Sequence, residues 1–203
     1  MRGIIQYDFN NYGFINNLDY DINEKNAICF FGSAITSSIG LPWELSFAYQ
    51  LCQQLTSKKF QAYNFSQGCM FVDNLEIINT VEFIKNMKSF KPAAYIIQFI
   101  GLDRRFYPEK KTGILNTNNE ENLNTFLQLF KKLENMLKNE KWIFFACDES
   151  SMEIPIDIKN HKNCLIWNPP MIDTLLRDVP GHKFHKMISL GLQNKLKELY
   201  NIG

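Results

Sequence analysis

The chain has 203 residues, of which 45% are hydrophobic and 21% charged, and its 22 basic side chains offset 21 acidic ones to a net charge of +1. This length and composition are typical of one globular domain with a sizeable core. The charge balance gives no basis for a nucleic-acid or membrane partner, and no apolar run reaches the roughly 20 residues of a membrane helix.

The N-terminal 26 residues are polar and lack the apolar stretch of a signal peptide. The five cysteines form no Cys-x-x-Cys pair, and most of them fall inside apolar runs, where a free thiol behaves as a small hydrophobe. We therefore expect a cytoplasmic protein with free thiols and with neither a structural metal nor a cofactor.

Apolar runs and helical periodicity alternate along the chain. The predicted strands are residues 27–31, 60–65, 93–100, 142–147 and 164–167, and the predicted helices are 41–55, 75–87, 123–137 and 185–199. Residues 101–121 are polar and predict a long loop. Alternating strands and helices favour an α/β fold with a mostly parallel sheet and helices on both faces. We expect residues 26–203 to form this single domain and residues 1–25 to form an N-terminal arm.

In such a sheet the functional site lies beyond the carboxyl ends of the strands. The loop after the first strand reads Gly-Ser-Ala-Ile-Thr-Ser-Ser-Ile-Gly, from Gly32 to Gly40. Small residues between a strand and a helix present backbone N–H groups to a bound anion or oxyanion. The same residues also suit an ordinary tight connection, and the loop alone does not decide between the two interpretations.

This segment resembles block I of the SGNH (GDSL-type) hydrolases, where a strand is followed by Gly-Asp-Ser-x-Thr-x-Gly. Gly32 and Thr36 match this pattern, and Ser33 takes the position of the aspartate. Ala34 takes the position of the nucleophilic serine, and Ser38 replaces the final glycine. The resemblance implies a three-layer, flavodoxin-like fold and an ester-hydrolase or acyl-transfer site for an O-acyl substrate, either a small molecule or a glycan.

Two further segments continue the resemblance in the right order. The run from Tyr63 to Gly68 is similar to block II, and this similarity implies that the Gly68 N–H belongs to an oxyanion hole. Gly101-Leu102-Asp103-Arg104 is similar to block III, but Asp103 stands where the family has its oxyanion asparagine, and Arg104 follows it. An ionised carboxylate would repel the charge that an oxyanion hole stabilises.

The last block of the family is Asp-x-x-His, and this chain allows two registers for it. Alignment on Pro180-Gly181 puts Val179 at the catalytic histidine and makes His185 the non-catalytic histidine that opens the last helix. Alignment on Asp178 leaves His182 one residue too late. The first register satisfies more positions, whereas the second would pair Asp178 with His182 as the orienting acid and the base. The remaining histidine, His161, is expected in an exposed loop.

A methyl group at position 34 cannot attack an acyl carbon, whereas the family mechanism needs a hydroxyl there. An engineered replacement would leave the other blocks intact, so three altered blocks favour natural degeneration or a chemistry moved to other residues. Whether the protein is an enzyme, an impaired esterase or a non-catalytic binding or scaffold protein on the same fold stays open. The oligomeric state stays open as well.

The first loop also resembles the sirtuin-like signature Gly-Ala-Gly-x-Ser-x-x-x-Gly-Ile-Pro, through Gly32, Thr36, Gly40 and Pro42. This second resemblance implies NAD binding. It rests on a single loop. In addition, no His-Gly pair follows, and the chain is short for that fold.

Overall fold

The computed structural model describes residues 8–11, 13–16, 19–66, 72–101, 104–107, 112–115, 119–147, 154–166 and 181–203, with 104–107, 112–115 and 119 described by their backbone alone. Five parallel strands form one sheet in the order β2-β1-β3-β6-β7. The strands are β1 (Ala27–Phe31), β2 (Gln61–Asn64), β3 (Ala94–Gln98), β6 (Trp142–Ala146) and β7 (Cys164–Ile166). This is the flavodoxin-like strand order, so the predicted fold class is confirmed.

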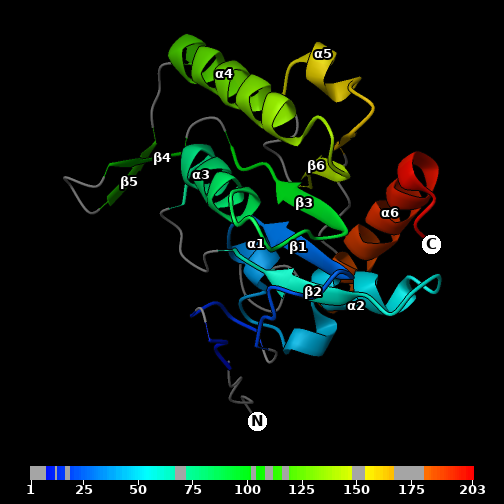
Figure 1. Ribbon diagram of the computed structural model, residues 1–203. Coiled ribbons are helices and arrows are strands. Elements are labelled where there is room, and N and C mark those ends of the chain that lie inside the picture. The colour runs from blue at the N-terminus through cyan, green and yellow to red at the C-terminus, as the bar shows by residue number, and fades with distance from the viewer. Residues whose placement is uncertain are drawn as a thin grey trace.

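Helices cover both faces of the sheet and make three layers (Figure 1). One face is covered by α2 (Phe47–Gln54) and α6 (His182–Tyr200), and the other by α3 (Asn74–Lys85) and α4 (Asn119–Leu137). Successive side chains of β1 divide between the two cores, because neighbouring residues of a strand point to opposite faces. A strand buried on both faces therefore reads as a continuous apolar run, which is why the central strands were predictable.

The connections differ more from the prediction. The predicted helix over residues 41–55 is a 3-10 turn η1 (Trp43–Leu45) followed by α2, because Ser46 is extended and caps α2 by accepting a hydrogen bond from the Tyr49 N–H. A short helix α1 (Ala34–Ser37) lies inside the loop that precedes it. The prediction of one long loop over 101–121 is wrong, since it contains the antiparallel pair β4 (Arg104–Tyr107) and β5 (Thr112–Leu115).

Two later elements also depart from the prediction. A four-residue helix, α5 (Ile156–Lys159), precedes β7. The last helix begins at His182, three residues earlier than predicted. Gly181 precedes it as the N-cap residue, with an extended backbone. None of the described helices is long and apolar enough to cross a membrane.

The described part of the N-terminal segment packs on β2. The Tyr20 ring stacks on Tyr63 with centroids 4.2 Å apart, and the Tyr20 hydroxyl donates to the Asn64 carbonyl oxygen at 2.7 Å. Asn16 is buried and donates to the Ala62 carbonyl oxygen at 2.9 Å. These contacts lie beside the candidate site, although the domain boundary at residue 25 stays a prediction.

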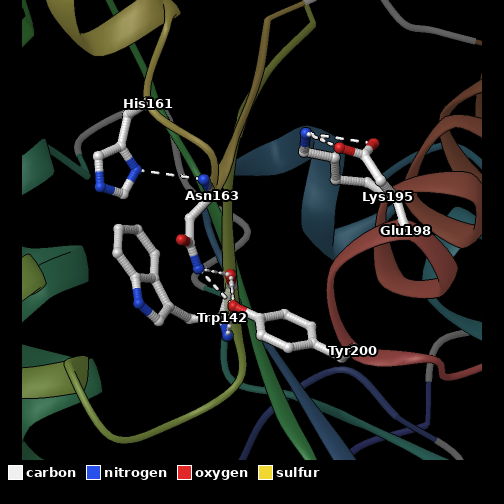
Figure 2. A network of polar contacts seen from close by, with 6 residues as sticks. All are labelled: Trp142, His161, Asn163, Lys195, Glu198 and Tyr200. Carbon is white, nitrogen blue, oxygen red and sulfur yellow. Dashed lines mark hydrogen bonds and ion pairs between the residues drawn. The ribbon is translucent and has the colours of Figure 1, made fainter.

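A polar network lies at the edge of the sheet where the strands β6 and β7 begin (Figure 2). The Tyr200 hydroxyl donates to the Trp142 carbonyl oxygen at 2.9 Å and accepts from the Trp142 N–H at 3.1 Å, and Asn163 donates to both of these oxygens. His161 stacks on Trp142 and lies 3.2 Å from a Glu134 carboxylate oxygen, with 22% of its side chain exposed. His161 lies in a loop between α5 and β7, as predicted, but it is only partly exposed, because an aromatic stack and an acidic neighbour hold it.

Candidate functional site

The turn after β1 is built around Gly32. A Cβ atom at this position would lie 2.3 Å from Thr36 Oγ1 and 2.6 Å from Gln98 Oε1. Both distances are far below any real carbon–oxygen contact, so only glycine lets the turn close this tightly. The close approach brings the end of β1, the helix α1 and the end of β3 together at one point.

Gln98, the last residue of β3, is the anchor of the turn. Its Oε1 accepts hydrogen bonds from the Thr36 hydroxyl at 2.6 Å and from the Ser33 N–H at 3.3 Å, and the Ser33 hydroxyl lies 3.5 Å away. The Ser33 N–H is an obligatory donor, so it fixes which end of the Gln98 amide faces the turn. Gln98 is 1% exposed, and its Nε2 has no partner in the part of the chain that the structure describes.

A second set of polar bonds joins α1 to the end of β2. Asn64 donates from Nδ2 to the Thr36 carbonyl oxygen at 3.1 Å, and its Oδ1 accepts from both the N–H and the hydroxyl of Ser66. The hydroxyls of Ser37 and Ser66 lie 2.8 Å apart. Tyr20 braces Asn64 from behind, and burial raises the pKa of its hydroxyl, which therefore keeps its proton.

The α1 turn ends at Ser38, which adopts the left-handed backbone conformation with φ of 58° and ψ of 36°. This is the position where the family pattern has glycine, and glycine reaches this conformation without strain. The Ser38 hydroxyl is buried and has no partner among the described residues. A serine therefore holds a backbone conformation here that glycine adopts more easily.

The hydroxyls of Ser33, Thr36 and Ser37, which lie closest to position 34 in the sequence, face neutral polar groups of the fold. Ala34 is half-buried at the start of α1, whereas Ser33, Thr36 and Ser37 are buried and bonded to neutral groups. Among the described residues, none of these three hydroxyls is hydrogen-bonded to a histidine or a carboxylate. A hydroxyl without a base is a weak nucleophile, so the described part of this site has no activated one.

The two C-terminal histidines lie on the first turn of α6 in different surroundings. His185 is buried, its Nδ1 accepts from the Phe47 N–H at 3.2 Å, and its ring stacks on Phe47. His185 thus joins α6 to α2, whereas α6 itself begins at His182, so the choice between the two registers stays a prediction. His182 is exposed, and no hydrogen bond joins it to Ser33, Thr36 or Ser37.

The other predicted site residues lie beyond what the structure describes. Gly68, Asp103 and Asp178 fall outside the described residues, and Arg104 is described only by its backbone, as the first residue of β4. The structure therefore brings together Gly32, Ser33, Ala34 and Thr36 and leaves the rest of the predicted set untested. In the described part of the chain, no group of three or more His, Cys, Asp or Glu residues is placed to hold a metal ion.

Three residues of this site were missed from the sequence: Asn64, Ser66 and Gln98. Gln98 had a usable signal, because it is the one polar residue in the otherwise apolar run from Ile96 to Ile100. A polar side chain in a strand buried on both faces needs a partner, and here the partner is the turn after β1. Asn64 and Ser66 follow the same logic at the end of β2.

Comparisons with known proteins place this fold among esterases. No family model and no curated protein matches the chain. Similar solved structures include the acetyl xylan esterase Est2A from the rumen bacterium Butyrivibrio proteoclasticus, with a TM-score of 0.57 and 14% identity over 89% of this chain and 66% of that one. They also include TesA, with a TM-score of 0.60 and 12% identity over 85% and 99%.

A further similar structure is a carbohydrate esterase whose active site displays divergent catalytic and non-catalytic binding functions, with a TM-score of 0.56 and 12% identity over 87% and 70% of the two chains. The chain thus spans about two thirds of the length of Est2A and nearly all of TesA. At these identities the likeness shows the fold alone, which is the SGNH hydrolase fold.

Proposed function

We propose that this chain is a non-catalytic binding protein on the SGNH hydrolase fold, whose site at the end of β1 and β3 holds the acyl group of an esterified small molecule or glycan. The observation that carries the proposal is the surroundings of the hydroxyls near Ala34: Thr36 donates to Gln98, the Ser33 hydroxyl lies 3.5 Å from the same oxygen, the Ser37 and Ser66 hydroxyls lie 2.8 Å apart, and the Ser38 hydroxyl is buried with no base beside it among the described residues. An esterase with a relocated nucleophile would need one of these hydroxyls free and beside a base.

The class of ligand is inferred from the fold. Est2A is an acetyl xylan esterase, and another neighbour is a carbohydrate esterase with a non-catalytic binding function. The methyl group of Ala34 is smaller than a serine side chain and lacks its polar hydroxyl, so an acyl methyl or a short alkyl chain suits this position. The loss of the nucleophile would then leave recognition without turnover.

This proposal is tested by comparing the binding of acetylated xylooligosaccharides with the binding of the same oligosaccharides after chemical deacetylation. We expect saturation-transfer NMR signals from the acetyl methyl groups of the first sample and no comparable signal from the second. The half-buried Ala34 should line the site, so Ala34→Leu should weaken the signal, whereas the matched control Thr56→Leu, at an exposed loop position, should not.

Release of free acetate in the same samples would point the other way. Turnover that scales with protein concentration and is lost in His182→Ala would establish an active esterase that uses the exposed His182, and would overturn the binding proposal. The sirtuin-like alternative has its own check, since titration with NAD gives no heat if the binding proposal is right.

A further inference from the structure

A groove lies at the end of the sheet opposite the Ala34 turn. It has a volume of about 500 Å³ and is lined by the segments that immediately precede β1, β2, β3 and β6, together with the last residue of α6 and the two residues that follow it, 200–202. Parallel strands all start at the same edge, so these segments meet although they are far apart in the sequence. We call this cavity the basal groove; its polar lining includes Lys25, Asn26, Lys58, Asn139, Lys141 and Tyr200.

The basal groove carries a surplus of positive charge. Lys25, Lys58 and Lys141 are exposed, and none of them forms an ion pair or a side-chain hydrogen bond within the described part of the chain. The one acidic side chain in the lining, Glu140, is already paired with Lys85. The whole protein has a net charge of only +1, so three lysines without an ion-pair partner among the described residues in one concave site are a local concentration of charge rather than a general property.

The Glu24 carboxylate, next to Lys25 in the sequence, partly offsets the charge of the lysines. Its two oxygens accept from neutral groups, the Asn26 N–H at 2.7 Å and the Gln61 side chain at 3.0 Å, and form no ion pair with Lys25, Lys58 or Lys141. Asn26 and Asn139 add side-chain amides, which donate hydrogen bonds as readily as they accept them. The groove therefore offers cations and neutral donors to whatever enters it.

The walls of the groove are held in place before any ligand arrives. Tyr200 lines it, and its hydroxyl is fixed by the Trp142 main chain and by Asn163 (Figure 2). Ser57, also in the lining, donates its N–H to the Gly203 carbonyl oxygen at 2.6 Å, and the Phe60 side chain is buried. A preformed concave site of this size suits a small molecule and loses little freedom on binding.

We propose that the basal groove binds a small, multiply charged anion, at a site separate from the Ala34 turn. Ammonium groups act as compact point charges that pair well with phosphate, and three of them around one cavity match a ligand with several negative charges. A polyphosphate and a polycarboxylate share this chemistry. Because the groove lies at the other end of the sheet, an acyl ligand at the Ala34 turn and an anion here would not compete for the same residues.

Calorimetric titration with pyrophosphate and, separately, with citrate tests the proposal at low ionic strength. We expect binding by the wild-type protein, and whichever anion binds more tightly identifies the phosphate or the carboxylate class. The double variant Lys58→Gln/Lys141→Gln should bind at least tenfold more weakly. The control variant Lys131→Gln/Lys162→Gln removes the same two charges from exposed positions outside the groove lining and should bind like the wild type.

Salt gives an independent readout, since raising the ionic strength from about 50 to 300 mM should weaken a charge-driven site several-fold. The absence of heat with both anions, or equal weakening in the two double variants, would overturn the proposal. All four lysines are exposed, so both variants should fold, and urea unfolding checks this directly. Neither titration involves the Ala34 turn, so the basal groove and the proposed acyl-binding function can fail separately.

Discussion

Ser38 occupies a position where the backbone is left-handed, and its side chain destabilises the folded state there. A non-glycine residue in this conformation is strained by about 1–2 kcal/mol, and the buried Ser38 hydroxyl has no partner within the described ranges. The α1 turn keeps its shape because the Leu41 N–H and the Ile39 N–H bond back to Ser38 and Ala34 carbonyl oxygens. The turn is therefore dictated by its surroundings and not by residue 38.

The Ser38→Gly variant should be more stable than the wild type by about 0.5–1 kcal/mol, because glycine removes the strain but gains freedom in the unfolded chain. Urea unfolding at neutral pH measures the difference. Asn201→Gly is the matched control, since Asn201 has a similar φ of 55° but asparagine tolerates this conformation. A Ser38→Gly variant less stable than the wild type would show that the serine hydroxyl has a partner that matters.

A substitution at Gly32 should lower the stability of the protein instead. Gly32→Ala would push a methyl group into Thr36 Oγ1 and Gln98, and overpacking of this kind costs about 1–3 kcal/mol of folding free energy. Gly203→Ala is the control, because its new methyl group would meet only the flexible Lys197 side chain, at 3.5 Å. Equal stability of the two alanine variants would mean that the turn after β1 is much looser than the contacts indicate.

At the scale of elements, the segment before β1 supports the candidate site through Tyr20. The Tyr20 hydroxyl bonds both the N–H and the carbonyl oxygen of Asn64, and Asn64 in turn holds α1 through the Thr36 carbonyl oxygen. This chain of contacts links the N-terminal segment, β2 and α1 in one small polar cluster.

Tyr20→Phe should cost about 1–3 kcal/mol, because the buried Asn64 main-chain groups lose their partner. It should also speed amide hydrogen exchange at Asn64 and in α1 more than in α4. Tyr49→Phe serves as the control, since the Tyr49 hydroxyl has no hydrogen-bond partner among the described residues. Uniform acceleration across the molecule would show instead that Tyr20 acts only on global stability.

The elements were predictable to different degrees, for physical reasons. The central strands have apolar residues on both faces, so 27–31 and 142–147 could be located to within a residue of β1 and β6. The β4–β5 pair could not be found, because its residues lack the alternation that a half-buried strand shows. In the site, the turn at Gly32 and Thr36 could be recognised from local spacing. The role of Gln98 could not, because its hydrogen bond with Thr36 joins residues that are 62 positions apart in the sequence.

At the scale of the whole molecule, the two cores hold several ionisable groups in their neutral form. Burial raises the pKa of the Cys164 thiol to about 12, and burial likewise raises the pKa of Cys29 and of Cys52. Each thiol is neutral in the folded protein at a pH where it would ionise in the unfolded chain. Their contribution to stability is therefore complete below about pH 8.5, the ordinary value for cysteine, and is lost as the pH rises towards 12.

The free energy of unfolding should fall between pH 9 and pH 11 by up to about 1.4 kcal/mol per pH unit for each such thiol. Urea titrations at several pH values measure this slope. Cys164→Ala is expected to be less stable at pH 7, because it loses buried volume. Its free energy of unfolding should nevertheless fall less steeply with pH, by the contribution of one thiol. An unchanged slope would mean that Cys164 titrates normally in the folded state.

The central claim is that the SGNH-like turn has lost its activated hydroxyl and serves recognition. Intact-mass spectrometry after incubation with a serine-directed fluorophosphonate tests it most directly, with Ala34→Ser measured beside the wild type. We expect no adduct on the wild-type protein, since Ser33, Thr36 and Ser37 are buried and bonded to neutral groups. A stoichiometric adduct on any of these three residues of the wild type would contradict the account.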